Sequence, residues 1–142
     1  MAGVFQLRVL AADSVFYEGP CTSLILPMPD GLYGIMARHT NTIGAVVPGE
    51  MTIRTPEDER IVAAVASGLF KIEDNEVMVL VETAERPEDI DLHRAQRSEA
   101  RAREELLQKR SMREYNEAQM WLARAVTRKR VYHRHRSGDL NR

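Results

Sequence analysis

The sequence is poor in cysteine, since Cys21 is the only one among 142 residues. No intramolecular disulfide can form, which favours a reducing compartment. A single thiol also cannot supply a zinc site built from cysteines. The histidines do not replace it, because His133 and His135 alternate with arginines that repel a cation, and we expect a solvated basic tail there.

Long apolar runs and catalytic motifs are absent as well. No segment approaches the roughly 20 apolar residues that span a bilayer, and the amino terminus has no signal-peptide or transit-peptide pattern. We therefore expect no direct membrane insertion and assign any membrane association to a partner. Phosphate-binding glycine loops, the paired-histidine zinc motif and the serine nucleophile elbow are missing too. No catalytic residue, resident cofactor or metal ligand is predicted.

Charge is divided unevenly along the chain. Up to Glu85 there are 5 Lys and Arg against 12 Asp and Glu, and from Arg86 onward there are 15 against 9. The formal net charge of −1 therefore combines an acidic first part with a basic second part. We predict two domains, residues 1–86 and 87–142, and expect the basic arm to seek an acidic partner.

Short runs rich in Val, Ile, Leu and Phe recur between turn signals before Pro87. The clearest are Val4–Leu10, Ser23–Leu26, Ile61–Val65 and Glu76–Val81. Segments rich in Pro, Gly, Asp and Asn separate them. Such regular spacing is typical of an all-β sandwich or barrel, and we expect the strands to end near Thr83.

Helix-forming residues replace this alternation after Pro87. We predict one helix from about Ile90 to Lys109, capped by Glu88 or Asp89, and a second from about Met112 to Arg134. The expected apolar stripes are thin: Ile90, Ala95, Ala102 and Leu106 on the first helix, and Tyr115, Leu122 and Val126 on the second. A hairpin that buries so little should be marginally stable, which suits a moving part. The predicted fold class is α+β: an amino-terminal all-β sandwich followed by a carboxy-terminal antiparallel two-helix hairpin.

Charged side chains, together with one serine hydroxyl, line up on both predicted helices. They are spaced i, i+3, i+7 and i+10 on the first helix and i, i+4 on the second: Asp91, Arg94, Ser98 and Arg101, then Arg124 and Arg128. Two such faces folded against each other would suit a polyanion such as a nucleoside triphosphate. The alternative is an ordinary solvated helix surface.

Motifs spread over almost the whole chain carry a family resemblance. In order they are Val15–Gly19, Leu26–Pro27, Asp30–Met36, His39, Pro48–Ile53, Ala66–Ile72, Asn75, Val77, Val79–Val81 and Thr83–Glu85. Together they resemble the epsilon subunit of bacterial F-type ATP synthases. The resemblance implies a non-catalytic subunit of the central stalk of a proton- or sodium-translocating complex. Such a subunit is peripheral, on the cytoplasmic face of the bacterial plasma membrane.

In that family the sandwich packs on the gamma subunit and on the polar loops of the membrane c-ring, and so couples rotation to synthesis. The residues that correspond to the ring-facing surface are Asp30, Gly31, Leu32, Tyr33, Arg38 and His39. Leu32 stands where an acidic residue is frequent, and residues 38–41 stand where Gly-His-Ala-Pro is frequent. The resemblance therefore implies that the ring-facing surface has the same location as in the family, and that its contacts with the ring differ in detail.

The hairpin resembles the family's regulatory element. That element lies folded against the sandwich, or extends along gamma into the head, between the alpha and beta subunits, and blocks ATP hydrolysis. Some bacterial members bind ATP in the folded form through Ile-Asp-x-x-Arg-Ala. The resemblance implies ATP as a regulatory ligand of Glu85, Ile90, Asp91, Arg94, Ala95, Arg101, Arg124 and Arg128.

The arm alone also leaves a second class of function open, a nucleic-acid-binding β-domain with a basic helical arm. An RNA binder usually interleaves aromatic residues for base stacking, and the arm has Tyr115, Trp121 and Tyr132 on differing faces. The acidic first part would also repel phosphate. We therefore expect protein partners and no nucleic acid.

Overall fold

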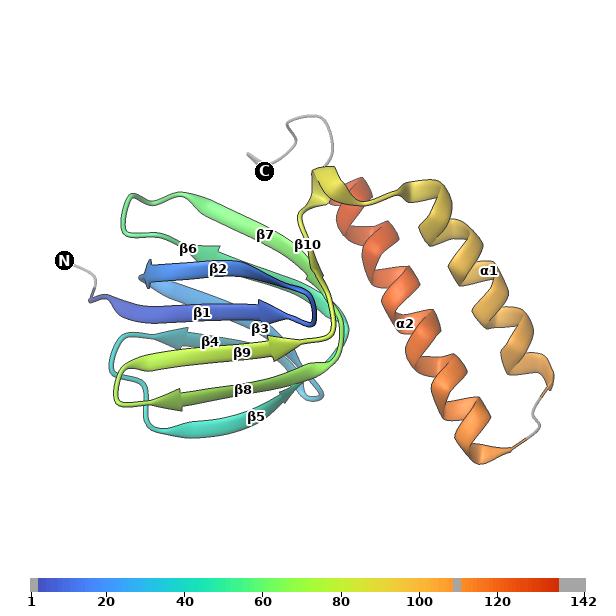
Figure 1. Ribbon diagram of the computed structural model, residues 1–142, viewed down its shortest axis with the longest axis horizontal. Coiled ribbons are helices and arrows are strands. Elements are labelled where there is room, and N and C mark those ends of the chain that lie inside the picture. Colours follow the sequence, from blue (N-terminus) through green and yellow to red (C-terminus); the bar gives the residue numbers. More distant parts are fainter. Residues whose placement is uncertain (1–2, 109–110, 136–142) are drawn as a thin grey trace. The chain divides into compact units, whose positions relative to one another are not determined.

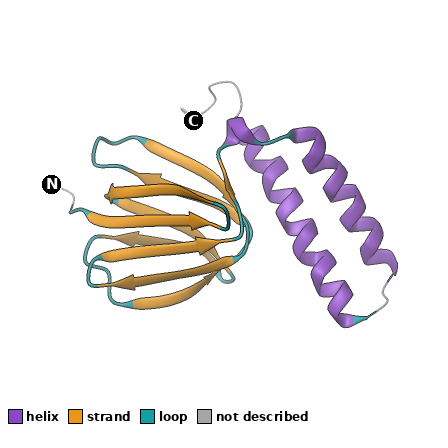
Figure 2. Ribbon diagram, in the orientation of Figure 1, coloured by secondary structure: helices purple, strands orange, loops and turns teal. Residues whose placement is uncertain are grey.

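The computed structural model describes residues 3–108 and 111–135, which form two compact units that divide between Arg86 and Pro87 (Figure 1). Within these residues, every strand belongs to the first unit and every helix to the second (Figure 2). The predicted α+β fold class is confirmed.

Two five-stranded sheets pack face to face in the first unit (Figure 1). The strands are β1 (Phe5–Ala11), β2 (Ser14–Cys21), β3 (Ser23–Met28), β4 (Gly31–Met36), β5 (Thr42–Val46), β6 (Gly49–Arg54), β7 (Arg60–Val65), β8 (Gly68–Glu73), β9 (Glu76–Val81) and β10 (Ala84–Glu85). The strand order is β2-β1-β9-β8-β5 in one sheet and β10-β7-β6-β3-β4 in the other. Neighbouring strands are antiparallel except β1 and β9, which are parallel.

Alternation of apolar and polar residues turns one face of each strand toward the space between the sheets. In β1, Phe5, Leu7 and Val9 are buried, whereas Gln6 and Arg8 are exposed. The core continues through Leu24, Leu26, Ile35, Met51, Ile53, Phe70, Ile72, Val77 and Val79. Burying one such side chain contributes about 1.5–3 kcal/mol. The sandwich therefore has a hydrophobic core of its own.

Close approach between strands requires glycine at two positions. A Cβ added at Gly68 would lie 1.9 Å from the backbone oxygen of Leu80, an atom that cannot move aside. A Cβ at Gly44 would lie 2.4 Å from the ring of Phe70. Because glycine has no Cβ, β8 can pack this close to its neighbours at both positions.

Strands β8 and β9 are joined by a two-residue turn, Asp74–Asn75. The φ angles of these residues are 51° and 63°. Two left-handed residues between paired strands make a type I′ turn, whose twist matches that of the sheet, and Asp and Asn tolerate this conformation. The turn therefore sets the register that pairs Glu73 with Glu76.

The second unit is an antiparallel helical hairpin. A single 3-10 turn, η1 (Pro87–Asp89), leads to α1 (Leu92–Gln108), and α2 (Met112–His135) returns along it. The expectation that Glu88 or Asp89 caps α1 is wrong, because both residues lie in η1. Instead, a carboxylate oxygen of Asp91 accepts the N–H of Arg94 at 3.0 Å.

The second helix begins with a reciprocal cap. The hydroxyl oxygen of Ser111 accepts the N–H of Glu114 at 3.1 Å, and the same hydroxyl donates to the Glu114 carboxylate at 3.2 Å. Ser111 thereby satisfies one of the unpaired N–H groups of the first turn.

Alanines form the seam between the two helices. Besides Val131 near the end of α2, the side chains that are at most 2 % exposed are Ala95 and Ala102 on α1 and Ala118 and Ala125 on α2. Their seven-residue spacing keeps each pair in line along its helix. The larger residues predicted for this stripe, Leu106, Tyr115, Leu122 and Val126, are only half-buried. Small side chains allow a close approach but bury little apolar area.

Candidate functional site

Asp91 and Arg94 meet at the start of α1. The N–H of Arg94 donates to Asp91, and this hydrogen bond, more than the nearby charges of Arg97, His93 and Arg94, holds the pKa of the Asp91 carboxyl below its usual range. One oxygen of Asp91 is thereby used for capping. The side chain of Arg94 is exposed on the first turn.

The four arginines implied as ATP contacts lie on the same side of the alanine seam. A surface hollow on that side is lined by Ser98, Arg101, Ala102 and Glu105 of α1 and by Trp121 of α2. Trp121 is followed at i+3 and i+7 by Arg124 and Arg128, so all three share one face of α2.

Arg94 and Ser98 share the corresponding face of α1 with Arg101. The structure therefore brings together the four predicted arginines, Arg94, Arg101, Arg124 and Arg128, along one flank of the hairpin. We call this flank the arginine side.

Acids lie beside two of these arginines. Glu105 approaches Arg101 at 3.8 Å, and Asp91 is engaged at the helix start. Arg124 and Arg128 are half-buried, which reduces their contact with water and strengthens any pairing with a phosphate. The arginine side is therefore suited chemically to a polyanion of several charges.

The opposite flank of the seam is held by an ion pair. Lys129 Nζ of α2 donates to Glu99 Oε1 of α1 at 2.7 Å. Arg103, which lies on α1 like Glu99, donates to Glu99 Oε2 at 3.0 Å. The hydrogen bond from Lys129, followed by that from Arg103, holds the pKa of Glu99 below its usual range. This pair joins α1 to α2 and was not found from the sequence, because its residues lie 30 positions apart.

Three of the residues implied as ATP contacts do not lie on the exposed surface of the arginine side. Ala95 is fully buried in the alanine seam, and Ile90 is 5 % exposed. Their side chains pack inside the protein. Glu85 is half-buried on β10 of the sandwich.

The residues predicted to face a ring separate into two places on the sandwich. Asp30, Gly31 and Leu32 lie at the β3–β4 turn, where Gly31 has a φ of 125° that favours glycine. Arg38 and His39 follow the other end of β4. Six residues of extended strand separate the two places by about 20 Å. The predicted residues therefore do not form one small patch.

Tyr33 joins the second of these places. Its hydroxyl donates to Nε2 of His39 at 2.8 Å, while Nδ1 of the same imidazole donates to the carbonyl of Thr40 at 2.8 Å. The Tyr33 ring packs on Phe70, with 5.7 Å between centroids. The imidazole is thus fixed by contacts at both ring nitrogens.

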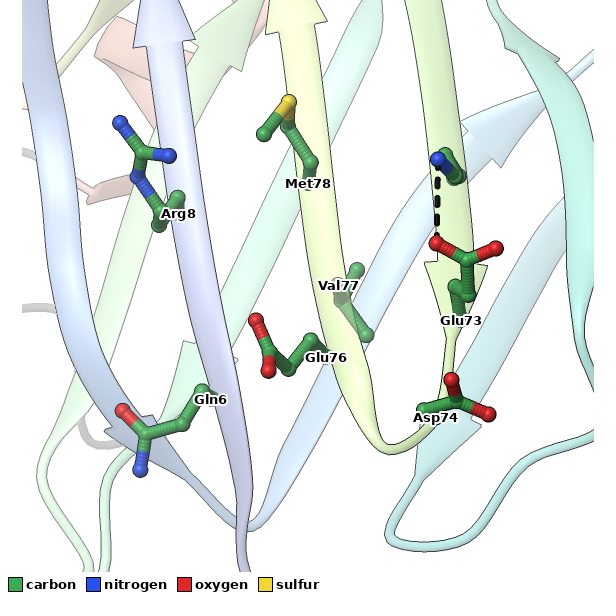
Figure 3. A pocket seen from close by; sticks show the side chains of 8 residues that line it. Gln6, Arg8, Glu73, Asp74, Glu76, Val77 and Met78 are labelled. Atoms are coloured by element: carbon green, nitrogen blue, oxygen red, sulfur yellow. Dashed lines mark ion pairs between the residues drawn. The ribbon is translucent and has the colours of Figure 1, made fainter.

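A second hollow lies on the outer face of the sheet that contains β1, β9 and β8 (Figure 3). Both of its basic lining residues are paired: Lys71 with Glu73 of the lining at 3.2 Å, and Arg8 with Glu18 of β2 at 3.0 Å. The remaining lining residues are Gln6, Asp74, Glu76, Val77 and Met78. Mixed charges of this kind favour no single class of ligand.

No metal centre is found among residues 3–108 and 111–135, since no group of three or more His, Cys, Asp or Glu side chains could hold an ion there. His133 is exposed as expected, but His135 is buried, so the prediction of a solvated tail is wrong at that residue. In the same described residues, none of the helices is both long and apolar enough to cross a membrane.

Two family descriptions match the chain in sequence. Residues 4–87 match "ATP synthase, Delta/Epsilon chain, beta-sandwich domain", and residues 88–132 match "ATP synthase, Delta/Epsilon chain, long alpha-helix domain". The boundary between the two matches lies beside the boundary between the two compact units.

Curated relatives match over most of their length. A protein of Ruminococcus albus named "ATP synthase epsilon chain" is 40 % identical over 126 residues, which cover 88 % of this chain and 93 % of the relative. A protein of Ruminiclostridium cellulolyticum with the same name is 38 % identical over 132 residues, covering 93 % and 98 %.

Solved structures show the same fold at low identity. A chain in the F1/c-ring assembly of the Euglena gracilis mitochondrial ATP synthase superposes with a TM-score of 0.70 and 18 % identity, over 82 % of this chain and 74 % of that chain. A chain in the central stalk and c-ring of the Tetrahymena thermophila enzyme gives 0.53 and 11 %, over 60 % and 68 %. At these identities the likeness concerns the fold.

Proposed function

The chain belongs to the delta/epsilon chain family of ATP synthase, as an epsilon subunit of the central stalk, and we propose that it couples rotation to synthesis and restrains ATP hydrolysis. Its proposed partners are the gamma subunit and the c-ring through the sandwich, and the alpha and beta subunits through an extended hairpin. It carries no catalytic step. As part of the complex it sits at the cytoplasmic face of the bacterial membrane.

The proposed nucleic-acid-binding alternative has less support. The matched relatives, at 40 % and 38 % identity, carry the name of an ATP synthase chain, and the match extends through the basic arm to residue 132. The basic arm is therefore a feature of a synthase subunit.

ATP is the proposed regulatory ligand of the arginine side. The observation that carries this proposal is that Arg101 of α1 lines one hollow with Trp121 of α2 only while the helices are packed together. Arg124 and Arg128 share the helix face of Trp121. A polyanion that contacts both helices binds the closed hairpin and has no equivalent site on separated helices. ATP would therefore shift the population toward the closed form.

The available binding energy is sufficient to act as a switch. A ligand that binds only one form stabilises it by RT ln(1 + [L]/Kd), about 2.7 kcal/mol when its concentration is a hundredfold above Kd. The seam that this must reinforce is built from alanines, each of which buries little apolar surface. At low ATP the closed form loses that support and the arm is free to extend.

The extended arm is proposed to bind acidic surfaces of the catalytic head. Its sequence contains no acid between Glu117 and Asp139, and this interval carries Lys129 together with Arg124, Arg128, Arg130, Arg134 and Arg136. Attraction between surfaces of opposite charge weakens as salt screens it. Inhibition of hydrolysis should therefore decline as ionic strength rises.

Titration calorimetry of the isolated protein with ATP tests the ligand. We expect heat of binding and thermal stabilisation of the helices for the wild type. Arg101→Ala or Arg128→Ala should weaken binding by about 1.5–3 kcal/mol, because each removes a charge-assisted contact. Matched controls are Arg97→Ala and Arg130→Ala, which remove exposed arginines of the same two helices. Absence of both heat and stabilisation at millimolar ATP would leave the arginine side an ordinary solvated surface.

A further inference from the structure

The loop between β4 and β5 has little apolar burial, since Ala37 is its one apolar residue packed against the core. Residues 37–41 contain no buried side chain: Ala37 and His39 are half-buried, and Arg38, Thr40 and Asn41 are exposed. A loop of this kind is ordinarily among the least rigid parts of a domain. Beyond the contact of Ala37, its order comes from hydrogen bonds.

Two side-chain amides supply those bonds. Asn75, in the β8–β9 turn, accepts the N–H of Arg38 on Oδ1 at 2.7 Å and donates from Nδ2 to the carbonyl of Val4 at 3.0 Å. In the other direction, the N–H of Asp74 donates to Oδ1 of Asn41 at 3.1 Å. The loop and the turn are therefore tied to each other at two points.

Arg38 is held in an unusual backbone conformation. Its φ is 60°, a left-handed value that costs a residue other than glycine about 1–2 kcal/mol. The bond from its N–H to Asn75 offsets that cost. The conformation is followed directly by His39, whose ring is fixed by Tyr33 and by Thr40.

We propose that Asn75 is a positioning residue that holds the loop of Arg38 and His39 in the orientation in which it engages the rotating ring. This rests on the proposed contact between the sandwich and the c-ring. Arg38 offers guanidinium donors, so the surface it fits carries acceptors, such as carboxylates or backbone carbonyls. Asn75 acts through the backbone of Arg38 and does not itself need to touch the ring.

Substitutions at position 75 separate positioning from the folding of the turn. Asn75→Gly keeps a residue that accepts the φ of 63° but removes both side-chain bonds. Asn75→Asp keeps the acceptor for Arg38 and removes only the donor to Val4. Asp58→Gly is the matched control, because Asp58 has a φ of 64° in the turn between β6 and β7. Asn41→Ala breaks the second tie independently.

The measurement is ATP-driven ion uptake relative to ATP hydrolysis, in vesicles that contain the whole synthase with each variant. We expect Asn75→Gly and Asn41→Ala to lower this ratio at least twofold, and Asn75→Asp and Asp58→Gly to leave it near the wild-type value. In the isolated protein, Asn75→Gly should speed hydrogen exchange of the Arg38 amide, and Asn75→Asp should not.

A normal coupling ratio in both Asn75→Gly and Asn41→Ala overturns the inference. If the melting temperature falls while the ratio stays normal, Asn75 has a structural role alone. The double variant Arg38→Ala/His39→Ala tests the ring contact separately. A normal ratio there would refute the proposed contact, whereas a low ratio there with a normal ratio in the Asn75 and Asn41 variants would refute only the positioning.

Discussion

Replacing Glu99 by glutamine should loosen the helical hairpin by about 1 kcal/mol. Glu99 joins α1 to α2 through Lys129, and their side chains are 13 % and 34 % exposed, so water screens the pair only in part. Exposed ion pairs contribute about 0–1 kcal/mol and hydrogen bonds to charged groups about 1.5–3 kcal/mol. The pair of Glu99 and Lys129 is half-buried and Lys129 can still reach water, so its contribution should lie between these two ranges. The expected change is about fivefold in the equilibrium between closed and open hairpin.

The fluorescence of Trp121 reports on the unfolding of the hairpin separately from that of the sandwich. It is the only tryptophan of the chain and lies on α2, next to the seam. Thermal unfolding monitored by tryptophan emission should show a lower midpoint for Glu99→Gln. The control is Glu104→Gln, which removes an exposed acid of the same helix. Equal midpoints in the two variants would show that the ion pair does not hold the helices together.

The stability of the hairpin should also depend on pH, in a direction set by the pKa of Glu99. The hydrogen bond from Lys129, and then that from Arg103, holds the pKa of Glu99 below its ordinary value of 4.5. A depressed pKa in the folded state means that the stabilisation is complete above the unfolded-state pKa and is lost as pH falls through the folded-state pKa. Acidification should therefore reduce hairpin stability more in the wild type than in Glu99→Gln. Parallel pH curves would refute the reasoning.

Three further predictions concern the two units separately. Gly68→Ala should destabilise the sandwich by at least about 2 kcal/mol, because its Cβ would meet the backbone of Leu80; denaturant unfolding checks this, and an unchanged midpoint would contradict it. Residues 1–86 alone should give the far-ultraviolet spectrum of a folded β-protein and co-purify with gamma, and an unfolded spectrum would show that the core needs the arm. Emission of Trp121 should change when ATP is added and should not change in Arg101→Ala/Arg128→Ala, since Trp121 and Arg101 line one hollow.

The parts of the fold that could be predicted are those with a strong periodic signal. Strands β1 and β9 alternate buried and exposed residues, so their positions follow from hydropathy. Strands β4 and β5 lie at sheet edges, and their exposed apolar residues Leu32 and Ile43 break the alternation. Edge strands of this kind carry little pattern for a sequence to reveal.

The arginine spacing on each helix could also be predicted, but the side of the seam could not. That side depends on which residues pack between the helices. On α2 the buried residues are Ala118 and Ala125, followed toward the end of the helix by Thr127, Val131 and His135. Alanine is common on any helix, so a search for larger apolar residues passes over it. Trp121 could have been found, because it lies three residues before Arg124 on the same helix face.

The contacts that order the sandwich loops could not be predicted from the sequence for a different reason. Asn75 and Arg38 are 37 residues apart, and nothing local in either segment indicates the other. The left-handed conformation of Arg38 is likewise set by that distant partner, since arginine has no preference for it.

The most direct test of the regulatory role is ATP hydrolysis by the assembled synthase with a chain that ends at Arg86, compared with the full chain. The shortened chain keeps every strand of the sandwich and loses both described helices. We predict that hydrolysis at low ATP rises severalfold while synthesis is largely kept, and that added salt raises hydrolysis only in the enzyme with the full chain. Unchanged hydrolysis in an enzyme that has incorporated the shortened chain would contradict the account.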